Sequence, residues 1–287
     1  MKPWTMPAPP VGVVIEKDLP YLDSARVERL DLYRPATASP EARFPGVVII
    51  HGGGWTGGDK ARPREFITGT TLALAGYVAV SIEYEKRDGL RWPLNLFDVK
   101  NAVRWLRENS DRLHVDSDHI GVIGGSAGGH LALMAAYTTG VKTLEPEQPY
   151  AGLSDKVQAV VDMYGITNLL TRQATHPDGT PNGELREAGL FAFKRGENVD
   201  MWRLASPVSH VTRNSPPTLI IHGSADTTVD RDQSEELARV LAAQGVTHRL
   251  IRVPGAGHAF PLVEKGIDLR ADVVAFFDRH LRGGGAR

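Results

Sequence analysis

Short apolar runs, rich in β-branched residues, recur along the chain and predict β-strands. Residues 47–50 (V-V-I-I) form one such run, and unbroken runs are typical of strands that helices cover on both faces. Residues 27–32 instead alternate apolar and polar side chains, which predicts a strand with one wet face near a sheet edge. Similar apolar runs predict further strands at residues 78–82, 120–123, 157–163, 218–221 and 250–253.

Helical patterns lie between several of these runs. Residues 97–109 and 235–244 each place apolar side chains along one helical face, and Gly245 suits the C-terminal end of the second helix. Alternating strands and helices predict a mainly parallel sheet with helices on both sides, in a single α/β domain over residues 1–287. In such a sheet, ligands bind at the C-terminal ends of the strands.

The alternation breaks in residues 166–204, where Asn, Thr, Pro and Gly interrupt short apolar pieces. We expect this segment to form a cap or lid over the site, because connections of this length are often lids. An ordinary long surface connection is the alternative.

Charge and composition narrow the partners and the chemistry. The 287 residues have a formal net charge of −1 in mixed order, which argues against nucleic acid as a partner. The absence of cysteine excludes a thiolate nucleophile and a Cys-ligated zinc site. The histidines lack metal-ligand spacing and the chain lacks a P-loop, so we expect no metal and no cofactor. Without a signal-like or membrane-length apolar stretch, a cytoplasmic protein with no membrane partner is expected, and homo-oligomerisation stays open.

A glycine-flanked serine follows one of the predicted buried strands. Residues 124–128 read G-G-S-A-G, come directly after residues 120–123 and precede an apolar helical stretch at residues 131–137. This strand, turn and helix context is the one in which a nucleophile elbow exposes its serine hydroxyl. Ser126 is therefore the predicted nucleophile, and a small-residue turn that merely begins a buried helix is the alternative.

A second glycine-rich turn, H-G-G-G-W at residues 51–55, follows the strand at residues 47–50. Glycines let backbone N–H groups approach a developing oxyanion, so the amides of Gly53, Gly54 and Ala127 are the predicted oxyanion hole. A flexible glycine turn is one alternative. Residues 52–57 also fit the dinucleotide fingerprint G-x-G-x-x-G, but Pro63 falls where its helix should run and Glu83 lies too far along the chain for its acid.

An acid and a histidine follow two further predicted strands. Asp226 closes the segment H-G-S-A-D after residues 218–221, and His258 ends P-G-A-G-H after residues 250–253. The chain order Ser, Asp, His is that of α/β-hydrolases, so His258 is the predicted base and Asp226 the acid that orients it. The competing candidates, each with a structural role as its simpler interpretation, are His130, His222, Asp230 and Asp232.

With these motifs the sequence resembles the α/β-hydrolase superfamily over roughly residues 27–280. It is most similar to bacterial carboxylesterases and feruloyl-esterase-like (BD-FAE-like) hydrolases with an H-G-G-G-W oxyanion motif, and it is related to hormone-sensitive-lipase-type and kynurenine-formamidase-like enzymes. The resemblance implies ester hydrolysis through an acyl-enzyme formed on Ser126, with no cofactor. Gly125 departs from the G-D-S-A-G elbow of the lipase-type group, and residues 1–26 are too short for that group's helical cap.

Substrate choice is predicted from the aromatic residues near these motifs. We expect Trp55, Phe191 and Trp202 to enclose a confined acyl or aryl site that favours short-chain or aromatic esters, feruloyl esters among them. A core-packing role for these side chains is the alternative. Hydrolysis of aryl amides or formamides by the same residues, and a binding protein that retains the fold without activity, are the other two functions left open.

Overall fold

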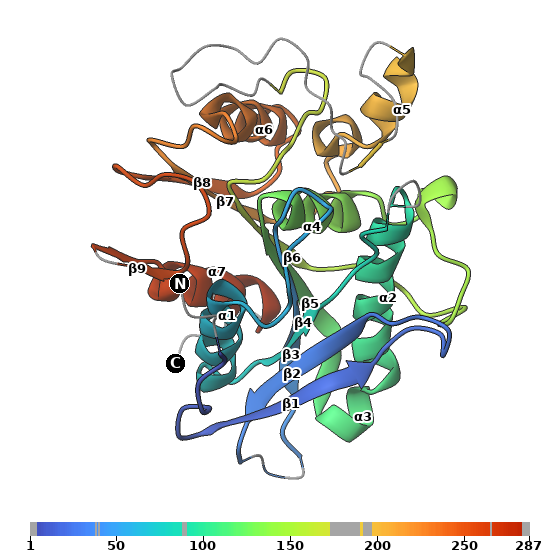
Figure 1. Ribbon diagram of the computed structural model, residues 1–287, viewed down its shortest axis with the longest axis vertical. Coiled ribbons are helices and arrows are strands. Elements are labelled where there is room, and N and C mark those ends of the chain that lie inside the picture. Colours follow the sequence, from blue (N-terminus) through green and yellow to red (C-terminus); the bar gives the residue numbers. More distant parts are fainter. Residues whose placement is uncertain are drawn as a thin grey trace.

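An eight-stranded sheet runs through the middle of the molecule in the order β1-β2-β4-β3-β5-β6-β7-β8 (Figure 1). The computed structural model describes residues 5–37, 39, 41–87, 91–172, 190–191, 197–264 and 266–282. Strands β1 and β2 pair antiparallel with each other, β2 pairs antiparallel with β4, and the pairs from β4 to β8 are parallel. The strands are β1 (Val13–Pro20), β2 (Arg29–Pro35), β3 (Phe44–Ile50), β4 (Val78–Ile82), β5 (Val115–Gly125), β6 (Ala159–Met163), β7 (Thr218–Gly223) and β8 (His248–Val253).

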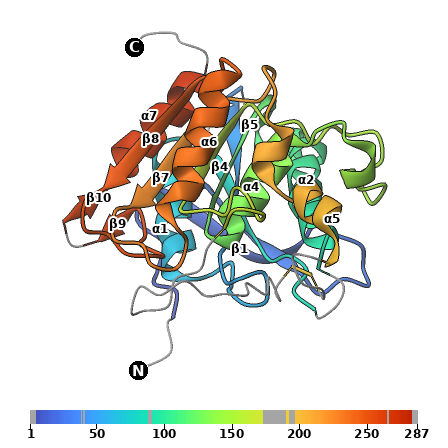
Figure 2. The ribbon, with the colours of Figure 1, turned by 90° about the horizontal axis from the view of Figure 1, so that it is seen from above.

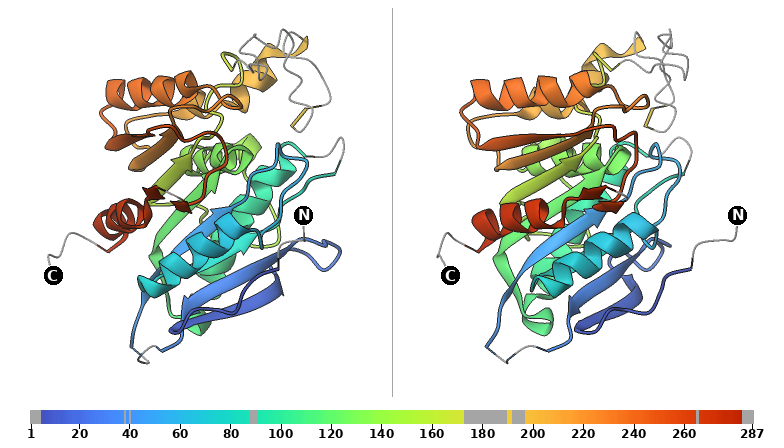
Figure 3. Two further views of the ribbon diagram at one scale, coloured as in Figure 1. Left: turned by 60° about the vertical axis from the view of Figure 1, so that its left-hand side comes forward. Right: turned by 90° about the vertical axis from the view of Figure 1, so that its left-hand side faces the viewer.

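Helices cover both faces of this sheet (Figures 2 and 3). Helices α1 (Pro63–Leu74) and α7 (Arg270–Leu281) pack on one face, and α2 (Leu94–Glu108), α4 (Ala127–Tyr137) and α6 (Arg231–Ala243) pack on the other. Two apolar clusters fill the layers between helices and sheet, as expected for strands buried on both sides. The remaining elements are α3 (Ser110–Leu113), α5 (Val199–Leu204), the short 3-10 turns Lys142–Leu144 and Pro207–His210, and the small pair β9 (Val263–Glu264) and β10 (Ile267–Asp268).

The predicted α/β-hydrolase fold is confirmed, and most of the predicted strands are present. The strand predicted at residues 27–32 begins later, at Arg29, because Val27 is exposed to solvent. Helix α1 was not predicted, and Pro63 is its first residue, a position where the missing N–H costs no hydrogen bond. Pro63 therefore starts a helix instead of interrupting one.

The proposed cap at residues 166–204 lies largely outside the described residues, since residues 173–189 and 192–196 are not among them. At its start, Ile166 and Leu169 are buried against the core, and α5 closes the segment at Leu204. Among the described helices, none is long and apolar enough to cross a bilayer. In the same part of the chain, His, Asp and Glu side chains form no group of three that could hold a metal ion.

Candidate active site

A sharp turn between β5 and α4 carries Ser126. Its backbone has φ 57° and ψ −124°, a conformation that a non-glycine residue adopts only when its surroundings impose it. A Cβ at Gly124 would lie 2.1 Å from the Gly128 carbonyl oxygen, and one at Gly128 would lie 2.2 Å from the Ile50 carbonyl oxygen. The Ser126 N–H donates to the Met163 carbonyl oxygen at 2.9 Å. Glycines on either side thus let the turn close tightly and hold Ser126 at the C-terminal end of β5.

His258 lies in the loop after β8 and faces Ser126. Its Nε2 is 3.0 Å from Ser126 Oγ, and its Nδ1 is 2.7 Å from Oδ2 of Asp226, which follows β7. The Tyr164 ring packs edge-on against the imidazole with ring centroids 5.0 Å apart, which restricts rotation of that ring. The structure brings together the three side chains that sequence analysis selected, at the C-terminal edge of the sheet.

The Asp226 carboxylate accepts hydrogen bonds on both oxygens. Oδ1 accepts the N–H groups of Thr228 at 2.8 Å and Val229 at 3.0 Å. Oδ2 faces His258 and also Nε2 of His222, which lies 3.3 Å away. Burial alone would raise the pKa of Asp226, but the hydrogen bonds from His222 and His258 outweigh it and hold that pKa far below its ordinary value. Asp226 is thereby kept as a carboxylate that can accept the His258 Nδ1–H.

The partners of His222 define its tautomer. Its Nε2 lies 2.9 Å from the Val229 carbonyl oxygen, which can only accept, so Nε2 carries the hydrogen. Its Nδ1 is then the acceptor for the Ser234 hydroxyl at 2.6 Å. His222, a competing candidate for the base, instead lies beside Asp226, with Nε2 facing the carboxylate.

The glycine turn after β3 lies directly over the nucleophile. A Cβ at Gly52 would lie 2.8 Å from the Gly125 carbonyl oxygen and 3.2 Å from Ser126 Cβ, so glycine allows this close approach of the two turns. The turn closes on itself because the Gly57 N–H donates to the Gly53 carbonyl oxygen at 2.9 Å. His51 Nδ1 is 2.7 Å from the Gly52 carbonyl oxygen, to which it donates, and the His51 ring stacks on Tyr84 with centroids 4.3 Å apart.

Three backbone N–H groups of this region are free to meet a ligand. Within the described residues, those of Gly53, Gly54 and Ala127 donate to no protein acceptor. Gly53 and Gly54 have φ values of 127° and 61°, a left-handed backbone that glycine adopts without strain. Ala127 is the first residue of α4, where an N–H has no partner inside the helix.

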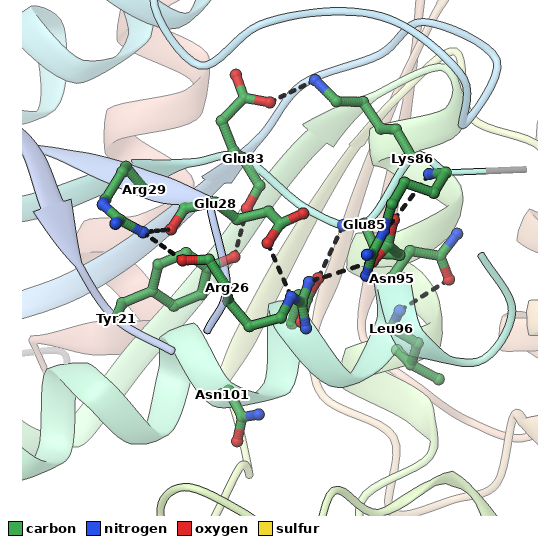
Figure 4. A network of polar contacts seen from close by, with 12 residues as sticks. Tyr21, Arg26, Glu28, Arg29, Glu83, Glu85, Lys86, Asn95, Leu96 and Asn101 are labelled. Atoms are coloured by element: carbon green, nitrogen blue, oxygen red, sulfur yellow. Dashed lines mark hydrogen bonds and ion pairs between the residues drawn. The ribbon is translucent and has the colours of Figure 1, made fainter. Parts of the chain in front are cut away.

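A partly buried polar network supports the glycine turn from the β4 side, and Figure 4 shows its pair of Glu83 and Lys86. Glu83 Oε1 accepts the Lys60 N–H at 2.9 Å, Oε2 pairs with Lys86, and the carboxylate lies 3.6 Å from His51 Nε2. Burial opposes ionisation, yet the interactions with His51 and Lys86 prevail and lower the pKa of Glu83 to about 2. Glu83 is a structural acid here, which removes the ribose contact that a dinucleotide site would need.

A cavity of about 730 Å³ opens beside Ser126 and His258. Its walls come from the glycine turn, the start of α1, and the loops after β6 and β8, and they combine apolar with charged side chains. Aromatic, apolar and arginine side chains of the lining include Trp55, Arg62, Arg64, Tyr164, Ile166, Arg172 and Pro261. Its volume suits a small molecule.

The three predicted substrate-binding aromatic residues are more buried than expected. Trp55 lines the cavity, but it is only 2% exposed. Trp202 is fully buried and Phe191 packs against it with ring centroids 5.2 Å apart. Neither Phe191 nor Trp202 is among the described residues that line the cavity, and both belong to the apolar core cluster. For these two residues the core-packing alternative is the one the structure shows.

His130 and Asp230, two of the other competing candidates, also have structural roles. His130 is fully buried on α4, its Nδ1 accepts the Trp55 indole N–H at 3.2 Å, and its Nε2–H donates to the Ala205 carbonyl oxygen at 2.7 Å. Burial lowers the pKa of His130 to about 4, so it stays neutral. Asp230 caps α6 by accepting the Asp232 N–H.

Arg64 and Tyr164 are among the residues of the cavity wall that sequence analysis missed. Tyr164 directly follows β6, so the rule that ligands meet the C-terminal ends of parallel strands could have indicated it. Arg64 gave no such signal, because α1 itself was not predicted and its approach to the elbow depends on tertiary packing.

Comparisons with known proteins identify the fold and the family of the chain. The chain is similar to a truncated carbohydrate esterase from gut microbiota, at 28% identity and a TM-score of 0.81, covering 94% of this chain and 97% of the other. It is also similar to butyrate-bound Est2, a thermophilic esterase of Thermogutta terrifontis, at 26% identity and a TM-score of 0.68, covering 87% of this chain and 86% of the other.

Among curated proteins, the chain is 32% identical to esterase LipQ of Mycobacterium tuberculosis over 246 residues. This alignment covers 85% of the chain but 57% of LipQ, so the chain spans little more than half the length of that relative. The BD-FAE family model matches residues 30–241, which is most of the sheet and the helices around it. The chain therefore belongs to the BD-FAE family and has the fold of the α/β-hydrolase esterases.

Proposed function

We propose that this chain is a serine carboxylesterase with Ser126 as nucleophile, His258 as general base and Asp226 as the acid that orients His258. The observation that carries this proposal is the continuous hydrogen-bond chain from Ser126 Oγ through the imidazole to Asp226, beside a cavity that Ser126 and His258 line. The esterase relatives support the same reaction class.

The reaction proceeds in two halves. His258 Nε2 takes the hydroxyl proton as Ser126 Oγ attacks the ester carbonyl, while Asp226 accepts the Nδ1–H and stabilises the imidazolium. The tetrahedral intermediate collapses as His258 returns its proton to the leaving alcohol, which leaves an acyl-enzyme on Ser126. Water, deprotonated by the same imidazole, then attacks the acyl carbon. The second tetrahedral intermediate collapses as its bond to Ser126 Oγ breaks and His258 returns the proton to that oxygen, which releases the acid.

The oxyanion of each tetrahedral intermediate needs donors that are already oriented. The N–H groups of Gly53, Gly54 and Ala127 are our candidates, since none of them donates to another acceptor within the described residues. Such donors stabilise charge that develops only in the transition state, and each is worth on the order of 10²-fold to 10³-fold in kcat.

We propose short-chain and aromatic esters as substrates. The cavity volume of about 730 Å³ and the apolar side chains of Trp55, Ile166 and Pro261 support this class over long-chain lipids. The butyrate in the similar Est2 structure is a short-chain acid, which fits the same size class.

A substrate panel tests the proposal. The purified chain is assayed with p-nitrophenyl acetate, butyrate and palmitate, methyl ferulate, and the matching anilide and N-formyl compounds. We expect the short-chain and aromatic esters to react fastest and Ser126→Ala to abolish their turnover. Faster anilide or formamide turnover would favour the amide hydrolase alternative, and equal rates for the two proteins would remove Ser126 from the mechanism.

Covalent labelling gives an independent readout. A fluorophosphonate should add once to the folded chain, on Ser126, because the imidazole activates this hydroxyl toward electrophiles. Heat-denatured protein and His258→Ala serve as controls and should not react. Peptide mapping that finds the adduct on another residue would contradict the assignment.

A further inference from the structure

Arg64, in the first turn of α1, extends its guanidinium into the space directly above the nucleophile elbow. A Cβ placed on Gly125, the residue before Ser126, would lie 1.6 Å from Arg64 Nη1 and 2.8 Å from its Cζ. These distances are far below any van der Waals contact. The guanidinium therefore occupies the position that a side chain at residue 125 would need.

From this position Arg64 contacts two of the segments that carry the site. Its Nη2 donates to the Ile50 carbonyl oxygen at 3.1 Å, at the end of β3 where the glycine turn begins. Its Nη1 donates to the Tyr164 hydroxyl at 3.4 Å. Glu65 holds the guanidinium in place, because Nε and Nη2 both donate to Glu65 Oε1.

Tyr164 extends this connection to the loop after β8 that carries His258, called the histidine loop below. Its hydroxyl donates to the Phe260 carbonyl oxygen at 2.8 Å, two residues after His258, and its ring packs against the imidazole. Tyr164 is fully buried and the Arg64 side chain is 14% exposed, so neither is free to leave without disturbing its neighbours. One guanidinium thus links the elbow, the glycine turn and the base.

We infer that Arg64 is a positioning residue for the proposed esterase reaction, and that a side chain at residue 125 would displace its guanidinium from this position. Loss of the guanidinium leaves Ser126, His258 and Asp226 in the chain but frees the turn and the histidine loop to shift. Shifts of about 1 Å in reacting groups can cost on the order of 10²-fold in rate.

A double-mutant cycle on the full chain tests this inference, which rests on the proposed esterase activity. The four proteins are the parent, Arg64→Ala, Gly125→Ala and the double variant. We expect each single change to lower kcat for p-nitrophenyl butyrate by about 10-fold to 100-fold with little change in KM. The double variant should be little worse than Arg64→Ala, because the guanidinium is gone and the added methyl group keeps only Tyr164 Cε2, at 3.0 Å, as a close neighbour.

Additive losses in the cycle, or a parental kcat in Arg64→Ala, would overturn the inference. If Gly125→Ala does not fold, recovery of folding in the double variant supports the shared space, and continued failure to fold contradicts it. An inactive parent chain would instead overturn the proposed function, so the two failures are distinguishable.

Two further variants separate positioning from general stability. Tyr164→Phe removes the link between Arg64 and the histidine loop, so its loss in kcat should not add to that of Arg64→Ala. Arg112→Ala, on α3 with side-chain hydrogen bonds to Asn109, removes an exposed arginine and should leave kcat unchanged. A Tyr164→Phe loss that adds in full to the Arg64→Ala loss would show that the two side chains act separately.

Discussion

Two buried aspartates lie near the C-terminal ends of neighbouring strands, and they differ in their surroundings. Asp226, after β7, receives N–H groups on both carboxylate oxygens and has a pKa far below its ordinary value. Asp162, on β6, is fully buried, and within the described residues neither of its oxygens has a hydrogen-bond partner of good geometry. Burial raises the pKa of Asp162 to about 7, although His222 and the Gly165 N–H partly offset this effect.

The comparison shows that oriented donors, more than depth in the fold, decide whether a buried acid is ionised. Asp226 is surrounded by donors because its loop turns back on itself and two histidines face it. Asp162 sits in a close-packed space, where a Cβ at Gly129 would lie 2.3 Å from its Oδ1 and one at Gly165 would lie 2.1 Å from it. The surroundings of Asp226 thus favour its charged form, and those of Asp162 favour its neutral form.

The largest contrast is expected in catalysis. Asp226→Asn should lower kcat about 10⁴-fold, because an amide at this position favours the wrong tautomer of His258. Asp162→Asn should leave kcat close to that of the parent, since this side chain contacts none of the reacting groups. Steady-state assays on both variants, with circular dichroism as the folding control, measure the difference. Equal losses in the two variants would place both acids in the same role.

A smaller effect is expected when Asp226 loses one donor. His222→Phe removes the Nε2–H that faces Oδ2 and should lower kcat by about 10-fold to 100-fold, as a hydrogen bond to a charged group is worth about 1.5–3 kcal/mol. His222→Gln keeps an N–H donor and should recover part of the loss. A glutamine variant as impaired as the phenylalanine variant would indicate that packing, and not donation to Asp226, is what His222 supplies.

The smallest effect concerns stability against pH. Folding raises the pKa of Asp162 from 3.8 to about 7, so between these values the folded chain holds a proton that the unfolded chain has lost. The free energy of unfolding should therefore decrease as the pH rises through this window. The asparagine of Asp162→Asn cannot ionise, so the substitution should flatten this slope. At pH 8 the variant should unfold at a higher urea concentration than the parent, with a free energy of unfolding larger by on the order of 1–3 kcal/mol.

Urea titrations of both proteins at pH 5 and pH 8 give the measurement. Asp226 acts in the opposite sense, because a lowered pKa stabilises the fold above the ordinary value of 3.8 and this stability is lost as the pH falls. Parallel pH dependence in the parent and Asp162→Asn would show that Asp162 is already solvated or paired in solution.

Sequence patterns predicted those parts of the molecule that follow local rules. The β-branched runs predicted most of the parallel strands, and the glycines around Ser126 predicted a tight turn, because backbone sterics act over a few residues. Strand β1 was missed because charged residues and a positive φ of 58° at Asp18 interrupt its pattern. No local rule separates an aromatic residue of a cavity wall from one of the core, so the burial of Phe191 and Trp202 could not be predicted from the sequence.

The environment of Asp162 is equally invisible to such rules. The local sequence around an aspartate in an apolar strand does not reveal whether hydrogen-bond donors surround its carboxyl group. In the folded chain, the close packing of Gly129 and Gly165 around Asp162 determines this environment. Likewise, the approach of Arg64 to Gly125 joins residues far apart in the chain. These features depend on the assembled tertiary structure, whereas the elbow depends on its own short sequence.

The two outer strands of the sheet, β1 and β8, affect whether copies of this chain can pair edge to edge. An open sheet offers unpaired N–H and C=O groups at each edge, which can template aggregation. At one edge, the pairing of β1 with β2 shifts register between Glu16 and Leu19, which distorts that edge. At the other, Arg249 and Arg252 of β8 pair with Asp272 and Glu235 and place charge along the strand. We expect these devices to keep the folded chain from growing into intermolecular sheets at high concentration.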